Sequence, residues 1–150
     1  MNSIVMINSG NIREYAIEGD LSVVAETFDH KYDLKNRTRL FANNCFDLCE
    51  LLSPGYYNNH IRSQLFRCST SIAANYRAAC LAQSKPSFIA KISIVIEEAD
   101  ETIYWLGLIK ERKIIESELL DLLCREAAEL TSIFIKSRKT ATQNLKNGSY

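Results

Sequence analysis

The sequence lacks acidic residues over a long central stretch. The chain of 150 residues contains 18 Asp and Glu, yet none lies between Leu51 and Ile96. The same stretch contains five cationic side chains, those of Arg62, Arg67, Arg77, Lys85 and Lys91. The net charge is zero, but residues 1–60 carry −3, residues 61–91 carry +5 and residues 92–150 carry −2. The chain is therefore dipolar, and the strongly basic balance of a typical nucleic-acid-binding domain is absent.

Glycine and proline are also scarce, with only five and two positions. Because these residues interrupt regular structure, their scarcity in long periodic stretches favours helices. Apolar residues make up 47% of the chain, which is an ordinary globular content and excludes a disordered protein. A chain of this length fits one domain with a single hydrophobic core.

Long hydrophobic runs are missing. No segment approaches the roughly 20 apolar residues that a membrane span requires. The run from Ile4 to Ile7 is too short for the core of a signal peptide, and no positive charge precedes it. We therefore expect a cytoplasmic protein that does not associate with membranes.

The usual marks of metal sites and catalysts are missing as well. The five cysteines form no CxxC pair, and neither His30 nor His60 completes a zinc-ligand spacing. Glu98 and Glu101 lack the histidines of a di-iron bundle. The sequence contains no Ser-His-Asp, Cys-His or glycine-rich phosphate motif. We expect no metal, no cofactor and no enzymatic activity, with the cysteines reduced and packed as small hydrophobes.

Apolar residues recur at helical spacing in four segments. They predict helices over residues 32–52, 58–82 and about 85–112, the last capped by Ser84, and a fourth that Ser117 opens. The expected inward positions are Leu34, Phe41, Cys45, Leu48 and Leu52; Ile61, Leu65, Cys68, Ile72, Asn75, Ala79 and Ala82; Phe88, Ile92, Val95, Ala99, Ile103 and Leu106; and Leu120, Leu123, Ala127, Leu130 and Phe134. With short connections they predict an all-α fold, an antiparallel up-down-up-down four-helix bundle.

We expect this bundle to occupy residues 31–140. Residues 1–30 form a weakly specified arm, in which Asn8 to Asn11 is loop-like and Asp20 is a candidate cap for a short helix from Leu21 to Phe28. Residues 141–150 are expected to be a basic, disordered tail.

Three polar side chains lie on or beside the apolar stripe of the second helix. Asn75 falls on the stripe itself, whereas Gln64 and Ser71 flank it among small residues. A buried Asn at such a position fixes the register and the choice of partner in coiled coils, and we prefer this structural role to a ligand contact.

The cationic side chains have two interpretations. The candidate phosphate contacts are Arg62, Arg67, Arg77, Lys85 and Lys91, together with Lys136, Arg138, Lys139 and Lys146 in an acid-free C-terminal segment. The alternative is ion pairing of Arg67, Arg77 and Lys91 with the acids of residues 97–101, which we consider more frequent in a neutral chain. The aromatic pairs Tyr56-Tyr57 and Tyr104-Trp105 suit a subunit interface better than base stacking.

Two motifs resemble a known family. Gln64, Arg67, Ser71, Ile72 and Asn75 follow the spacing Q-x-x-R-x-x-x-S-I-x-x-N, which resembles the core of the bacterial four-helix bundle proteins, also called 23S rRNA intervening-sequence proteins. The segments Phe88-Ile89-Ala90-Lys91, Glu98-Ala99-Asp100-Glu101-Thr102 and Tyr104-Trp105-Leu106 resemble its second block. The resemblance covers about residues 31–140, and Ala78 stands where the family usually has Glu.

The resemblance implies an antiparallel bundle that assembles into a homopentamer, without a known activity. It also implies an association with 23S rRNA genes, in whose intervening sequences members are encoded. We therefore expect a homo-oligomeric protein that binds RNA or DNA weakly through its basic surfaces. The alternative is a scaffold or accessory subunit that binds another protein and has no nucleic-acid role. The direction in which Arg67 and Arg77 point discriminates between the two.

Overall fold

A computed structural model describes residues 4–9, 12–17 and 33–148 of the chain. The chain divides into two compact units, residues 1–32 and 33–150. The second contains four helices, α1 (Leu34–Leu51), α2 (Tyr56–Cys80), α3 (Lys85–Glu111) and α4 (Glu118–Lys146). The first contains two strands, β1 (Ile4–Ser9) and β2 (Ile12–Ile17), which pair in antiparallel register from Ile4 with Ile17 to Ser9 with Ile12.

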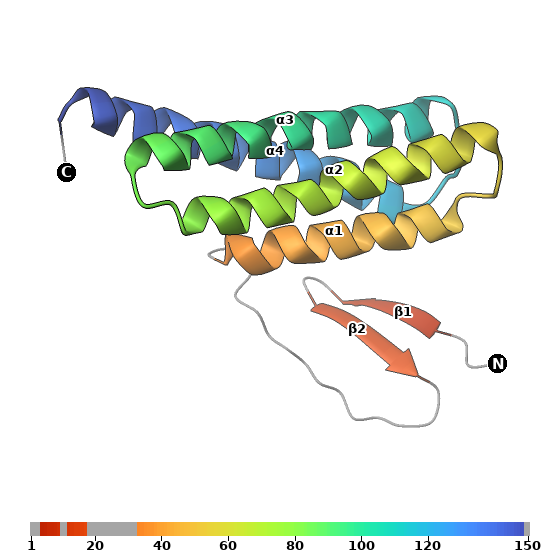
Figure 1. The fold of residues 1–150 in the computed structure, drawn as a ribbon. Coiled ribbons are helices and arrows are strands. Elements are labelled where there is room, and N and C mark those ends of the chain that lie inside the picture. Colours follow the sequence, from red (N-terminus) through yellow and green to blue (C-terminus); the bar gives the residue numbers. More distant parts are fainter. Residues whose placement is uncertain (1–3, 10–11, 18–32, 149–150) are drawn as a thin grey trace. The chain divides into compact units, whose positions relative to one another are not determined.

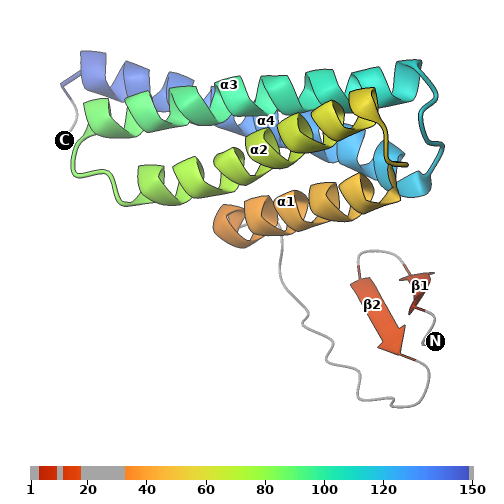
Figure 2. The same cartoon turned by 45° about the vertical axis from the view of Figure 1, so that its right-hand side comes forward.

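The four helices run up and down beside one another, and both views show each helix antiparallel to the next (Figure 1, Figure 2). Each helix packs on the next in sequence, and α1 closes the bundle against α4 through the smallest of these interfaces. The core between them is apolar, and its largest fully buried side chains include Phe41, Leu48, Leu65, Ile72, Ile92, Leu106, Leu130 and Phe134. The predicted all-α four-helix bundle is confirmed. Within the described ranges, no helix combines the length and apolarity needed to cross a membrane.

The helix boundaries follow local signals in the sequence. Ser84 caps α3 by accepting a hydrogen bond from the Ser87 amide at 3.2 Å, and Ser117 caps α4 by accepting one from the Leu120 amide at 3.1 Å. Asp33 caps α1 in the same way. The stop after α1 falls at Ser53-Pro54-Gly55, because Pro lacks a backbone donor. Both predicted serine caps are confirmed.

The inward stripe of α3 differs from the prediction at one position. Ile103 was expected in the core but is 36% exposed, whereas Thr102 is fully buried. The buried positions of α3 step from Ala99 to Thr102 and then to Leu106. A buried threonine is tolerated here because its hydroxyl donates to the Glu98 carbonyl at 2.8 Å, so its polar group is not left unsatisfied.

Two segments differ from the sequence-based expectation. The hairpin of β1 and β2 was not predicted, and Asn8 and Ser9, which were interpreted as part of a loop from Asn8 to Asn11, belong to β1. The disordered tail was expected from residue 141, but α4 continues to Lys146, because Ala141 and Leu145 extend its apolar spacing. The helix proposed from Leu21 to Phe28 lies outside the described residues.

All five cysteines are free thiols. Cys45, Cys49 and Cys68 are buried, as expected for small hydrophobes, whereas Cys124 is half-buried and Cys80 is exposed. Burial raises the pKa of the Cys45 thiol well above its ordinary value and that of Cys49 to about 11. Both therefore remain protonated near neutral pH and are poor nucleophiles.

The packing of Phe134 generates a test of the core. Its ring is fully buried and lies 5.4 Å from the ring of Tyr76, between centroids. We expect Phe134→Ala to lower the free energy of unfolding by about 3–5 kcal/mol, because it leaves a cavity between α2 and α4. The neighbouring Ile135→Ala serves as control, since Ile135 is 45% exposed. Equal losses in urea unfolding for both variants would contradict this packing.

Candidate nucleic-acid interface

The antiparallel topology collects the charges at opposite ends of the bundle. At one end α2 finishes, α3 begins and α4 finishes (Figure 1). Residues 71–96 and 130–148 form this basic end, with seven Lys and Arg and no Asp or Glu. Residues 47–66 and 97–129 form the acidic end, with twelve Asp and Glu and five Lys and Arg. Segments far apart in the sequence thus build a bundle with an axial charge separation.

The cations of the basic end make no ion pair within residues 33–148. They are Arg77, Lys85, Lys91, Lys136, Arg138, Lys139 and Lys146. Arg138 donates a long hydrogen bond of 3.4 Å to the hydroxyl of Ser93 on α3, which tethers its guanidinium without neutralising it. Arg77, Lys136 and Lys139 are exposed. Seven of the nine candidate phosphate contacts therefore share this end and keep their charge available.

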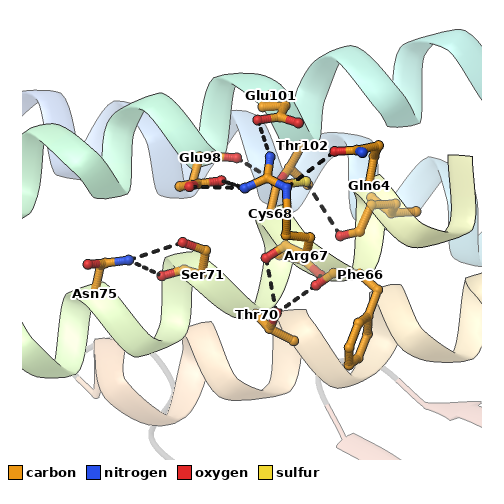
Figure 3. Close-up of polar contacts among 12 residues, drawn as sticks. Gln64, Phe66, Arg67, Cys68, Thr70, Ser71, Asn75, Glu98, Glu101 and Thr102 are labelled. Atoms are coloured by element: carbon orange, nitrogen blue, oxygen red, sulfur yellow. Dashed lines mark hydrogen bonds and ion pairs between the residues drawn. The ribbon is translucent and has the colours of Figure 1, made fainter. Parts of the chain in front are cut away.

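Arg67 has a different environment, in the middle of the bundle. Its guanidinium pairs with Glu98, 3.0 Å from Oε2, and with Glu101, both on α3 (Figure 3). Its Nε also donates to Gln64 Oε1 at 3.2 Å, and Trp105 Nε1 donates to Glu101 Oε1 at 3.1 Å. We call these five residues the Arg67 cluster. Arg67 is thus paired with α3 acids and is removed from the set of free phosphate contacts.

The charges of the Arg67 cluster stabilise one another. The hydrogen bond from Arg67 holds the pKa of the Glu101 carboxyl below its ordinary value, and the indole of Trp105 acts in the same direction. The same bond raises the pKa of Arg67. Since the cluster lies at the surface, solvent screens it, and its contribution to stability is modest. Ala78 stands where the motif usually has a glutamate. Arg67 nevertheless has carboxylate partners, because Glu98 and Glu101 of α3 pair with it.

The other predicted side chains of α2 make local contacts. Arg62 lies 3.4 Å from Glu50 of α1, so it is paired as well. Asn75 was expected to be a buried residue that fixes register between helices. It is only half-buried, and its Nδ2 donates to the carbonyl and the hydroxyl of Ser71 in its own helix, both at 3.0 Å (Figure 3). Within this chain α2 itself satisfies the amide, and a role of Asn75 in register or partner choice stays a prediction.

The described residues offer no metal site. Glu98 and Glu101 both bind Arg67, so a guanidinium already compensates their charge. No group of three or more His, Cys, Asp or Glu within residues 4–9, 12–17 and 33–148 is arranged to hold a metal ion. The aromatic side chains Tyr56, Tyr57 and Tyr104 are exposed at the acidic end, away from the free cations.

Sequence reasoning missed a groove at the basic end. It has a volume of about 520 Å³ and lies between the first turns of α3 and the last turns of α4. Phe88 forms part of its lining, with Lys85 from α3 and with Lys136, Thr140 and Asn144 from α4. Lys136, Thr140 and Asn144 follow one another at i, i+4 spacing, so the sequence alone could have placed them on one face of a helix. This shared face was overlooked because the chain was predicted to be disordered beyond residue 140.

Comparison with known proteins decides the family. Residues 30–136 match the family described as "23S rRNA-intervening sequence protein". The chain belongs to this family. A solved structure from the S23 ribosomal protein family of Bacteroides thetaiotaomicron VPI-5482, a protein with unknown function, is 32% identical to it. The match covers 70% of this chain and 97% of that chain, with a TM-score of 0.62. No curated protein matches the chain.

The Arg67 cluster generates a second test, because Trp105 is the only tryptophan. Protonation of Glu101 removes the negative acceptor beside the indole, so Trp105 emission should titrate with acid. We expect a midpoint below about 4.3, the ordinary value for glutamate, and a higher midpoint in Arg67→Gln. Stability from this carboxylate is present at neutral pH and lost as the pH falls through its lowered pKa. The control is Arg112→Gln, an exposed cation outside the cluster. An unchanged midpoint in Arg67→Gln would refute the assignment.

Proposed function

We propose that this protein is a non-enzymatic homo-oligomer that binds nucleic acid weakly through its basic end. The observation that carries the proposal is the gathering of seven cations at one end of the bundle, in segments of α2, α3 and α4 that contain no acid. Within the described residues none of these cations forms an ion pair. A surface of this kind attracts phosphates by releasing their counterions, and the affinity then depends on salt.

The acidic end orients the protein on a nucleic acid. Because its net charge is negative, it repels the phosphate backbone while the basic end attracts it. The zero net charge of the chain limits the affinity of one subunit. A closed ring would present the basic end several times, and multivalency would then raise the affinity without a new contact.

Exposed apolar side chains support the oligomer. Ile103 and Tyr104 on α3 are 36% and 60% exposed, and Phe66 on α2 is 46% exposed. Such residues favour burial against another copy of the chain. The number of five subunits rests on the family resemblance alone.

The second candidate function is a scaffold that binds another protein. The pairing of Arg67 and Arg62 with glutamates favours it, because these two cations then no longer attract phosphates. The unpaired cations of the basic end favour the first proposal. The two proposals therefore differ in whether the basic end or the aromatic surface of the acidic end makes the functional contact.

Nucleic-acid binding is tested by fluorescence anisotropy with labelled RNA and DNA at about 50 and 200 mM salt. We expect binding at the lower salt and a steep loss at the higher. The double variant Arg77→Gln, Lys139→Gln should weaken binding and reduce the salt slope by about 0.7–0.9 for each lost phosphate contact. Arg67→Gln should have a smaller effect, because Arg67 is already paired.

The matched control removes the same charge from the acidic end. Arg112→Gln with Lys113→Gln changes two exposed cations there, and we expect unaltered binding. Equal weakening by both double variants would mean that only net charge matters. The absence of any binding at 50 mM salt and micromolar protein would favour the scaffold.

Light scattering tests the oligomer. We expect a particle of five times the 17.1 kDa chain mass at micromolar concentration, and a smaller particle for Ile103→Asp, which places a charge on the exposed apolar side of α3. Leu122→Asp is the control, since Leu122 is equally exposed (39%) but lies on α4. A 17.1 kDa monomer for the unaltered chain would refute the oligomer.

A further inference from the structure

The groove at the basic end exists because α1 is short. Helix α1 has 18 residues and α4 has 29, so α1 is shorter by roughly 16 Å at 1.5 Å per residue. The two views show that α1 begins well inside the end formed by the other helices (Figure 1, Figure 2). One end of the bundle is therefore built from three helices instead of four.

The position of α1 on α4 is marked by an ion pair. Arg37 of α1 binds Glu126 at 2.6 Å and Glu129 at 3.0 Å. The face of α4 that carries these glutamates continues at helical spacing through Ile133, Lys136 and Thr140. These residues line the groove together with residues of α3, and no residue of α1 does so. Among residues 33–148, the groove thus continues the surface of α4 on which α1 packs, beyond the beginning of α1.

The lining of the groove combines one aromatic ring with cationic and polar side chains. Phe88 packs against the core on one side and lines the groove with the other. Lys85 of α3 and Lys136 of α4 supply one ammonium group from each helix. Thr140 and Asn144 of α4 add a hydroxyl and an amide. The groove has a volume of about 520 Å³ and is broadly open to solvent.

We propose that this groove binds an unstacked nucleotide of single-stranded RNA. The base stacks on Phe88, and Lys85 and Lys136 contact the phosphates on its two sides. The hydroxyl of Thr140 and the amide of Asn144 bond the 2′-hydroxyl and the base edge. This inference rests on the proposed nucleic-acid function and specifies the form of nucleic acid that the basic end recognises.

An aromatic ring in an open groove discriminates against duplexes. In a double helix the faces of the bases are stacked on one another, so Phe88 meets only the backbone and the groove edges. A single strand turns a base out at lower cost, and each base stacked on an aromatic ring gains affinity with little sequence preference. The ammonium groups act on either form, whereas the ring acts only on an unpaired base.

The test measures anisotropy of the full chain with a labelled 12-nucleotide RNA, its RNA duplex and the DNA strand of the same sequence, at about 50 mM salt. We expect the RNA strand to bind more tightly than the duplex and the DNA strand. Phe88→Leu keeps the apolar volume but removes the ring, and should weaken RNA-strand binding about fivefold or more while leaving the duplex unaffected. Lys85→Gln with Lys136→Gln should reduce the salt slope for the strand by about 0.7 for each contact.

Tyr104→Leu is the matched control, since it removes an exposed aromatic ring from the acidic end. Circular dichroism establishes that each variant keeps its helices. If strand and duplex bind equally and Phe88→Leu alters neither, the groove assignment is overturned while nucleic-acid binding stands. Equal affinity for the DNA strand overturns the assignment to RNA. If no nucleic acid binds, the proposed function fails first, and the groove assignment fails with it.

Discussion

The antiparallel packing of the four helices is the constraint on which the other features of this protein depend. The connections between helices have four, four and six residues, so each helix must return along its predecessor. This return places the end of α2 beside the beginning of α3 and the end of α4. Because acids are missing from all three segments, a charge pattern spread along the sequence becomes a separation along the bundle axis. The core fixes this arrangement, and the charges themselves contribute little to holding it.

The same geometry explains why cations of similar type have different environments. Arg67 lies halfway along α2, at the level where α3 changes from an acid-free to an acid-rich segment, so Glu98 and Glu101 are within reach. Arg77, nearly three turns further along α2, lies beside the acid-free beginning of α3. Distance along the bundle axis therefore decides which cation is neutralised.

The sequence was sufficient for features that depend on local spacing and insufficient for those that depend on helix rotation and length. The stripe of α4 and the serine caps could be predicted because i, i+4 spacing and capping chemistry act within one turn. Ile103 was misplaced because a choice between steps of three and four is settled by packing against α2. The hairpin was missed although Gly10-Asn11, between apolar runs, is a turn signal. The groove required the relative lengths of α1 and α4, which no single segment reveals.

The extension of α4 beyond α1 links the stability of the basic end to its charge. Within residues 33–148, α1 does not extend over the last turns of α4, and the Lys and Arg side chains of these turns are exposed or half-buried. Cations at a helix C-terminus interact favourably with the helix dipole, whereas acids there would weaken it. Lys146, in the last turn of α4, therefore both stabilises this helix end and attracts phosphates. A longer α1 would cover the groove, and acids in these turns would destabilise the helix end and repel the proposed ligand.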